Sequence, residues 1–147
     1  DEDYVIPFGK ARIVQEAEES KIKNGESVVV VTYGRGVYWA LEAAQNFPGQ
    51  VEIIDLRTLS PRDEEAVFNA VHKHNKCVLV TEENCEASFT LGVAGKIQKN
   101  CFKSLDAPVE IVGSLDTPAI PLNSILEAAM LNNADKVKQG ISNVLSF

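Results

Sequence analysis

Four consecutive valines, at positions 28–31, constrain the fold of this chain more than any other feature. An unbroken run of β-branched residues is typical of a strand that is buried on both faces, as in a parallel sheet. The run continues into Thr32 and Tyr33, and Gly34 and Gly36 then turn the chain. Because parallel strands need crossover connections, we expect helices between the strands.

Strands and helices are expected to alternate along the rest of the chain. Apolar runs of strand length are followed by segments whose apolar residues recur at helical spacing. We expect strands over residues 28–32, 51–56, 77–81 and 109–112, and helices over residues 37–47, 61–74, 89–102, 123–130 and 133–145. Ser60 is the expected cap of the helix over 61–74, and Pro61 suits its first position, where a missing N–H costs little.

An edge strand is expected before this series, over residues 10–15, where Ala11, Ile13 and Val14 form a short apolar run. Polar residues follow, and among them Asn24 and Gly25 form a strong turn signal. We interpret this segment as a hairpin that leads into the strand over 28–32. Helices on both faces of the sheet define an α/β fold of three layers, an α/β/α sandwich.

Length and charge fit one globular domain and exclude some classes of partner. The chain has 147 residues, 45% of them hydrophobic, which is enough to bury one substantial core. Asp and Glu outnumber Lys and Arg by 21 to 14, and a net charge of -7 would repel a phosphate backbone, so we expect no nucleic-acid partner. No apolar run approaches the roughly 20 residues that span a bilayer, so we expect no membrane partner.

Cysteine usage and the start of the chain bear on its compartment and its domain limits. Three cysteines without a CxxC pair argue against a disulfide framework and favour a reducing cytoplasm. Cys77 and Cys101 lie in apolar segments and are expected in the core. The chain begins without Met in a charged stretch, and we interpret residues 1–8 as a linker, residues 9–147 as the domain, and the whole as a fragment of a larger chain.

Candidate site residues gather where the expected strands end, because open α/β sheets bind ligands and partners at the carboxyl ends of their strands. The candidates are Gly34, Arg35, Arg57, Glu82, Glu83 and Asn84. The adjacent glutamates could serve as acid and base or could hold a basic partner surface. The simpler interpretation is a set of solvated loops, some of them at an interface.

The glycine turn and the nearby charges each admit two interpretations. Amides of the turn over residues 34–36 could hold an anion, as in a dinucleotide-binding fingerprint. The third glycine of that fingerprint is missing, and a lone GxG more often marks a tight turn from strand to helix. Asp55 and Arg57 lie two apart along a strand, so an ion pair within the domain is favoured over substrate binding.

We expect no catalytic, cofactor-binding or metal-binding residue in this chain. Cys85 lies at a strand end without a histidine that would activate its thiol, and His72 and His74 point to different faces of a helix. A phosphate loop ending in Lys-Ser or Lys-Thr, an HExxH motif and a GxSxG motif are all absent from the sequence.

Several segments together resemble the transketolase C-terminal domain family. The resemblance is carried by residues 6–11 (Ile-Pro-Phe-Gly-Lys-Ala), 30–34 (Val-Val-Thr-Tyr-Gly), 55–63 (Asp-Leu-Arg-Thr-Leu-Ser-Pro-Arg-Asp), 79–83, 105–109 and 133–137, and so covers nearly the whole chain. The opening Pro-Phe-Gly-Lys-Ala favours the branch of the family formed by beta subunits of 2-oxo-acid dehydrogenases.

The resemblance implies a five-stranded mixed sheet whose first strand runs antiparallel to the rest. It also implies a parent enzyme that uses thiamine diphosphate and Mg to decarboxylate pyruvate or branched-chain 2-oxo acids oxidatively, and that passes the acyl group to lipoyl. Both cofactors belong to other domains, so this domain alone is expected to be inactive. Its implied partners are an alpha subunit or upstream thiamine-diphosphate-binding domains, a second copy, and the lipoyl acyltransferase core.

Other functions remain open from the residues alone. The chain could be the C-terminal domain of a transketolase or of a deoxyxylulose phosphate synthase-type enzyme. A free-standing α/β module could instead bind an anion at Gly34 and Gly36, which requires the amides of that turn to be open. A complete small enzyme that uses Cys85, or Glu82 and Glu83, would require a pocket with perturbed ionisation around those side chains.

Overall fold

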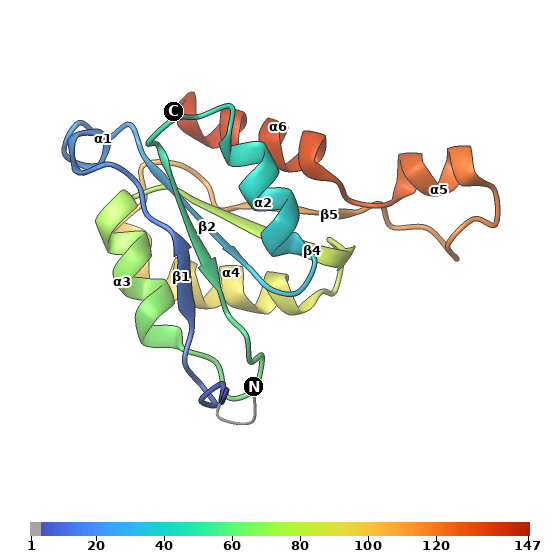
Figure 1. The fold of residues 1–147 in the computed structure, drawn as a ribbon, viewed down its shortest axis with the longest axis horizontal. Helices are drawn as coiled ribbons and strands as arrows, with labels where there is room; N and C mark the ends of the chain where they lie inside the picture. The colour runs from blue at the N-terminus through green and yellow to red at the C-terminus, as the bar shows by residue number, and fades with distance from the viewer. Residues whose placement is uncertain (1–3) are drawn as a thin grey trace.

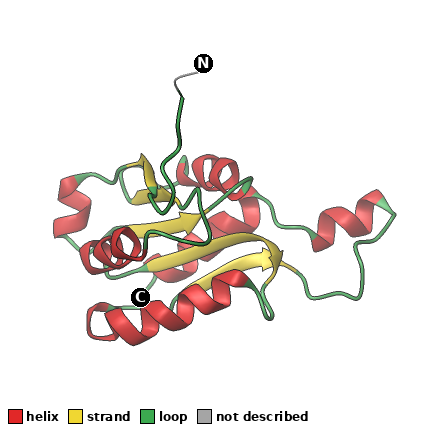
Figure 2. Ribbon diagram, turned by 90° about the horizontal axis from the view of Figure 1, so that it is seen from below, coloured by secondary structure: helices red, strands yellow, loops and turns green. Residues whose placement is uncertain are grey.

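The structure, a computed structural model, describes residues 4–147 and shows a five-stranded sheet between two layers of helices (Figures 1 and 2). The strands are β1 (Arg12–Gln15), β2 (Val28–Thr32), β3 (Val51–Asp55), β4 (Cys77–Asn84) and β5 (Glu110–Ser114). Their order in the sheet is β1-β3-β2-β4-β5. β1 pairs with β3 antiparallel, whereas the other pairs are parallel, so the expected α/β fold with an antiparallel first strand is confirmed.

Helices cover both faces of the sheet, as the alternating pattern predicted. They are α1 (Glu19–Lys23), α2 (Gly36–Ala44), α3 (Glu64–His74), α4 (Phe89–Cys101), α5 (Ser124–Met130) and α6 (Ala134–Leu145), with a 3-10 turn at Phe102–Ser104. In Figure 1, α2 and α6 lie on one side of the sheet and α3 and α4 on the other. This arrangement is the expected three-layer sandwich.

The valine run explains why the sheet is buried on both faces. Val28 and Val30 pack with α2 and α6, and Val29 and Val31 pack with α3 and α4. All four are at most 1% exposed. Since successive residues of a strand point to opposite faces, one continuous valine run can supply the centre of both cores.

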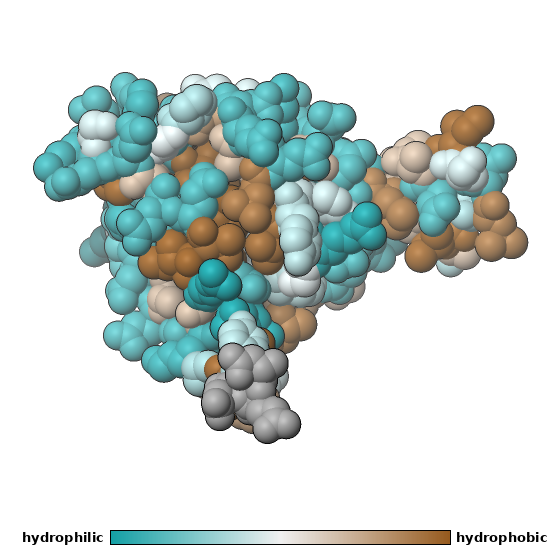
Figure 3. Space-filling view, in the orientation of Figure 1, coloured by the Kyte–Doolittle hydropathy of each residue, from teal (hydrophilic) through white to brown (hydrophobic). Residues whose placement is uncertain are grey.

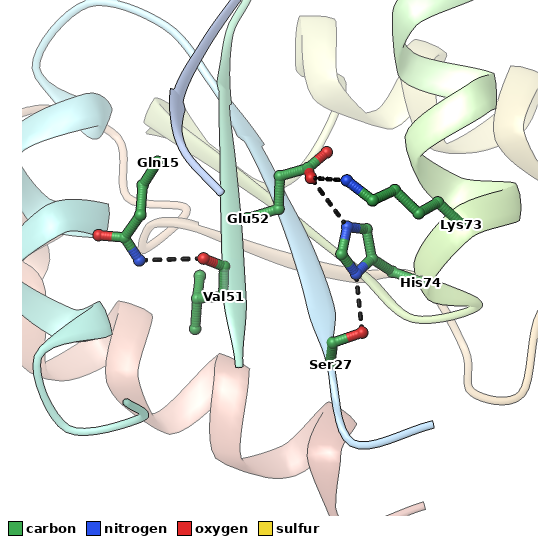
Figure 4. Close-up of polar contacts among 6 residues, drawn as sticks. All are labelled: Gln15, Ser27, Val51, Glu52, Lys73 and His74. Carbon is green, nitrogen blue, oxygen red and sulfur yellow. Dashed lines mark hydrogen bonds and ion pairs between the residues drawn. The ribbon is translucent and has the colours of Figure 1, made fainter. Parts of the chain in front are cut away.

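The expected hairpin between the first strand and β2 is wrong. β1 pairs with β3, with Arg12 opposite Asp55, and β2 lies on the far side of β3. The intervening residues contain α1, a single helical turn that Asn24 ends. Apolar periodicity could not reveal α1, because the structure buries none of its residues. Gln15 additionally ties β1 to β3, since its Nε2 donates to the carbonyl oxygen of Val51 at 2.9 Å (Figure 4).

Element boundaries also differ from expectation, among them the start of α3 and the end of β4. α3 begins at Glu64, and its cap is Asp63 instead of Ser60, because the Asp63 carboxylate accepts the Ala66 N–H at 3.1 Å. β4 continues to Asn84, so the adjacent glutamates extend the strand instead of forming a loop. Ser114 supports this extension by donating its hydroxyl to the Glu82 carbonyl oxygen at 2.8 Å.

Residues 115–131, which we call the arm, stand away from the rest of the molecule in both ribbon views (Figures 1 and 2). The arm follows β5 at its carboxyl end and contains α5, none of whose residues is buried. Its exposed apolar side chains are Leu115, Ile120, Leu122, Ile125 and Leu126. Figure 3 shows this apolar surface on the projecting part of the molecule.

Candidate interaction face at the carboxyl edge of the sheet

Glu82 and Glu83 organise the carboxyl edge of the sheet. Glu82 Oε1 accepts the backbone N–H of Arg35 at 3.1 Å. Glu83 Oε1 accepts the hydroxyl of Tyr33 at 2.9 Å and the backbone N–H of Phe89 at 3.2 Å. Burial raises the pKa of Tyr33, and its hydrogen bond to Glu83 adds to that rise, so the phenol stays protonated and donates. Both glutamates therefore connect β4 to the turns that follow β2 and precede α4.

The turn over residues 34–36 requires glycine at two positions, and the Arg35 amide within it already has an acceptor. A Cβ on Gly36 would lie 2.1 Å from Thr32 Oγ1, and Gly34 has a φ of +57°, so both positions favour glycine. The Glu82 carboxylate accepts the Arg35 N–H that an anion would need. A phosphate here would also face two carboxylates. This geometry favours the tight-turn interpretation over the free-standing anion-binding module.

Of the other predicted site residues, Arg57 lies apart from this group and Asn84 lies beside it. Arg57 follows the end of β3, where its Nε lies 3.8 Å from Asp55 Oδ2 and its guanidinium donates to the Tyr4 hydroxyl at 2.9 Å. The expected ion pair within the domain is therefore present, although Arg57 has a φ of +57° and lies outside the strand. Asn84 donates to Asp116 Oδ1 at 3.1 Å, which links β4 to the arm.

Cys85 has none of the features of an activated thiol. It is half-buried, and burial raises the pKa of its thiol. Its Sγ lies 3.8 Å from the Ile111 carbonyl oxygen. Cys77 and Cys101 are buried as expected. A small enzyme built on a Cys85 thiolate is thus disfavoured, because an activated cysteine requires a lowered pKa.

The base of the arm is fixed by Asn132 and Lys136, which the sequence analysis did not single out. Asn132 is buried, and its Nδ2 donates to the carbonyl oxygens of Thr81 at 2.9 Å and Val112 at 3.0 Å. The Lys136 ammonium donates to the last carbonyls of the arm, at Ala129, Met130 and Leu131. A cation at this position also complements the helix dipole of α5. The arm is therefore held in a defined place at its base.

A cleft of about 770 Å³ lies between the arm and the carboxyl edge of the sheet. Its lining includes the three carboxylates of Glu82, Glu83 and Glu127, the guanidinium of Arg35, and apolar surface. The apolar lining comes from Trp39, Ile120, Ala128 and Leu131. The Arg35 guanidinium stacks over the Trp39 ring at 5.8 Å, so one cation already lies at one wall.

A second polar cluster lies at the opposite, amino-terminal edge and is buried (Figure 4). Ser27 Oγ lies 2.8 Å from His74 Nδ1, and His74 Nε2 lies 3.2 Å from Glu52 Oε2. Lys73 also donates to that oxygen of Glu52. This connectivity is that of a Ser-His-acid triad, but Ser27 is 0% exposed and Glu52 1%, so no substrate can reach it. We therefore exclude this cluster as a candidate catalytic site.

The five-stranded sheet with an antiparallel first strand, covered by helices on both faces, defines an α/β domain of three layers. The sequence matches the family described as "Transketolase, C-terminal domain" over residues 16–137. The chain belongs to the transketolase C-terminal domain family, as its sequence motifs predicted.

Known relatives of the chain include dehydrogenase beta subunits. It is 36% identical to the 2-oxoisovalerate dehydrogenase subunit beta of Bacillus subtilis, over 99% of this chain and 43% of the relative. It is 37% identical to the pyruvate dehydrogenase E1 component subunit beta of Rickettsia conorii, over 97% of this chain and 42% of the relative. The chain thus spans less than half the length of these curated relatives.

A solved structure supports the fold. The chain of a structure described as "Split gene transketolase, inactive beta4 tetramer" superposes with a TM-score of 0.76 at 18% identity, covering 99% of this chain and 45% of that chain. In residues 4–147, no helix combines the length and apolar character that crossing a membrane requires.

Proposed function

We propose that this chain is the C-terminal assembly domain of a thiamine-diphosphate-dependent 2-oxo-acid dehydrogenase. The parent enzyme would decarboxylate pyruvate or a branched-chain 2-oxo acid oxidatively and transfer the acyl group to lipoyl. The domain would contribute subunit dimerisation and docking, with an alpha subunit or thiamine-diphosphate-binding domains and the lipoyl acyltransferase core as partners. Free cysteines suit a reducing cytoplasm as its compartment.

The arm is the observation that carries this proposal. Five large apolar side chains are exposed along residues 115–131, and α5 buries none of its residues against the rest of the chain. Contiguous apolar surface of this kind marks a protein–protein interface. The N-terminal segment exposes further apolar side chains at Tyr4, Val5, Ile6 and Phe8, and the Tyr4 hydroxyl accepts a hydrogen bond from Arg57, which follows β3. In this proposal residues 1–8, of which 1–3 lie outside the described residues, belong to the linker and residues 9–147 to the domain.

The residues of this chain do not fit thiamine diphosphate. A diphosphate requires cations or unpaired amides. The cleft at the carboxyl edge presents one cation, Arg35, which stacks over Trp39, together with the carboxylates of Glu82 and Glu83, and the Arg35 amide already donates to Glu82. No group of three His, Cys, Asp or Glu in residues 4–147 could hold a metal ion. We therefore assign both cofactors to other domains of the parent and no catalytic residue to this one.

Assembly of the parent enzyme tests the proposal. Ile125→Ser with Leu126→Ser removes apolar surface from the arm, and Leu91→Ser with Phe102→Ser removes similarly exposed surface from α4 and the turn after it. Sedimentation of the parent assembly should show dissociation with the arm pair and normal assembly with the control pair. Normal assembly with both pairs would contradict the proposal.

A further inference from the structure

We propose that Asn24 and Gly25 form a site of spontaneous backbone modification, at which deamidation through a cyclic imide produces isoaspartate and detaches the buried Lys76 from its acceptor. This Asn-Gly pair is a strong turn signal in the sequence, but the hairpin expected from it does not form. In the structure the pair ends α1 and precedes β2. The site lies within the chain itself and does not depend on the proposed assembly role.

The chemistry of an Asn-Gly pair needs no reagent except water. The backbone nitrogen of Gly25, once a base has taken its proton, attacks the side-chain carbonyl carbon of Asn24. A bond forms between Gly25 N and Asn24 Cγ, the bond from Cγ to Nδ2 breaks, and the departing nitrogen takes up a proton and leaves as ammonia. Water then opens the imide: attack at the backbone carbonyl carbon of Asn24 gives isoaspartate, and attack at Cγ gives aspartate. Glycine favours the first step, because it has no Cβ to shield its nitrogen.

The structure leaves the Asn24 side chain unrestrained. Asn24 and Gly25 are both exposed, and within residues 4–147 the Asn24 side chain makes no hydrogen bond. A Cβ on Gly25 would meet nothing within 4 Å, so there is room for a ring beside this glycine.

The reaction requires a local opening, which the construction of α1 makes easy. The Asn24 backbone is helical, with a ψ of -3°, and the Gly25 N–H donates to the Ile22 carbonyl oxygen at 3.1 Å. Both must change before the Gly25 nitrogen can reach Cγ of Asn24. α1 is five residues long, buries none of them and lies at the margin of the fold (Figure 1), so this turn can open while the sheet stays folded.

Asn123, which precedes Ser124, shows what protects an exposed asparagine from this reaction. Its Oδ1 accepts the N–H groups of Ile125 at 3.0 Å and Leu126 at 3.2 Å, as the cap of α5. These bonds fix the side-chain carbonyl group, and Ser124 carries a Cβ that glycine lacks. Asn24 has neither restraint, so it should react first.

Isoaspartate at this position would displace the acceptor of a buried cation. Lys76 is 7% exposed, and its ammonium donates to the Gly25 carbonyl oxygen at 3.0 Å, the one hydrogen bond of that ammonium within residues 4–147. Isoaspartate routes the main chain through Cγ and so inserts an extra methylene group just before Gly25. The Gly25 carbonyl then shifts, and a buried ammonium that loses its acceptor destabilises the fold.

The site is tested by incubating the whole chain in mildly alkaline buffer, folded or unfolded in urea, and mapping its peptides by mass spectrometry. In the folded chain we expect conversion at Asn24 before Asn123 and every other asparagine, with isoaspartate in excess over aspartate. Conversion of Asn24 only in the unfolded chain, or earlier conversion of another asparagine in the folded chain, would overturn the proposal.

The loss of the Lys76 contact is tested on the isoaspartate form after its separation by chromatography. This form should unfold at a lower urea concentration than both wild type and Asn24→Asp. Asn24→Asp is the matched control, because it carries the same added charge on an ordinary backbone. Equal unfolding midpoints for the isoaspartate form and Asn24→Asp would show that Lys76 keeps its acceptor and would overturn this half of the proposal.

Discussion

Glu52 is a charged residue on a strand whose neighbours are buried and apolar. Its side chain is 2% exposed and contacts Lys73 and His74 at the end of α3. Burial alone would raise the pKa of Glu52, but the contacts with His74 and Lys73 outweigh it, and the pKa lies below its usual value. The folded state thus favours the ionised carboxylate of Glu52, so the free energy of unfolding depends on pH.

We predict that Glu52→Gln destabilises the fold at neutral pH by about 2 kcal/mol, because an amide cannot replace the charge-assisted contacts. Because the pKa of Glu52 is lower in the folded state than in the unfolded state, its carboxylate stabilises the fold fully above the unfolded-state pKa of about 4.3. This stabilisation is lost as the pH falls through the folded-state pKa. The difference between variant and wild type should therefore shrink below about pH 4. Urea unfolding at several pH values measures it, and a difference that is constant with pH would contradict the assignment.

The serine of the same cluster allows a second prediction. Ser27→Ala removes the hydroxyl that lies 2.8 Å from His74 Nδ1 and leaves a buried ring nitrogen without that partner. We expect a loss of about 1–3 kcal/mol in the free energy of unfolding. Ser20→Ala, at an exposed position on α1, is the control and should change stability by less than about 0.5 kcal/mol.

At the scale of an element, the glycines of the helices differ in what surrounds them. A Cβ on Gly140 in α6 would lie 2.5 Å from Val112 Cγ2 on β5, so this glycine lets the helix approach the sheet closely. A Cβ on Gly95 in α4 would meet nothing within 4 Å. Only the first of these glycines is required by packing.

We predict opposite effects for alanine at these two positions. Gly140→Ala should destabilise the fold by about 1–3 kcal/mol, because the added methyl group overpacks the contact between α6 and β5. Gly95→Ala should stabilise it by about 0.5–1 kcal/mol, because alanine favours a helix interior. Thermal unfolding of the two variants compares them directly, and the same sign of change in both would contradict this account.

The elements that sequence reasoning placed well are those whose apolar periodicity decides their structure. The valine run of β2 and the apolar faces of α3 and α6 belong to this group. The start of α3 was misplaced because Ser60 and Asp63 can both cap a helix and Pro61 suits a first helical position. Only the contact of Asp63 with the Ala66 N–H shows which residue is the cap. α1 was missed because it is polar and buries no residue.

For the whole molecule, the order of the strands and the place of the arm depend on long-range contacts. Motifs implied an antiparallel first strand, but no local signal indicated that β1 lies beside β3. Gly34, Arg35, Glu82 and Glu83 lie together at the carboxyl ends of the strands, where the sequence analysis expected candidate residues. Asn132 was missed because asparagine is common before a helix, where Asn133 caps α6. The hydrogen bonds of Asn132 to the carbonyl oxygens of Thr81 and Val112 form only in the folded chain. Glu52 could have been noticed as a charge inside an apolar run.

The central claim is that this domain supports catalysis through assembly and supplies no chemical group. The most direct test is the decarboxylation rate of the parent enzyme, measured per assembled particle, with Glu83→Gln and Cys85→Ala introduced together. The account predicts a rate within about twofold of wild type, because neither side chain takes part in proton transfer or covalent catalysis. A loss of about 100-fold or more in correctly assembled enzyme, the size expected for a general acid or base, would contradict it.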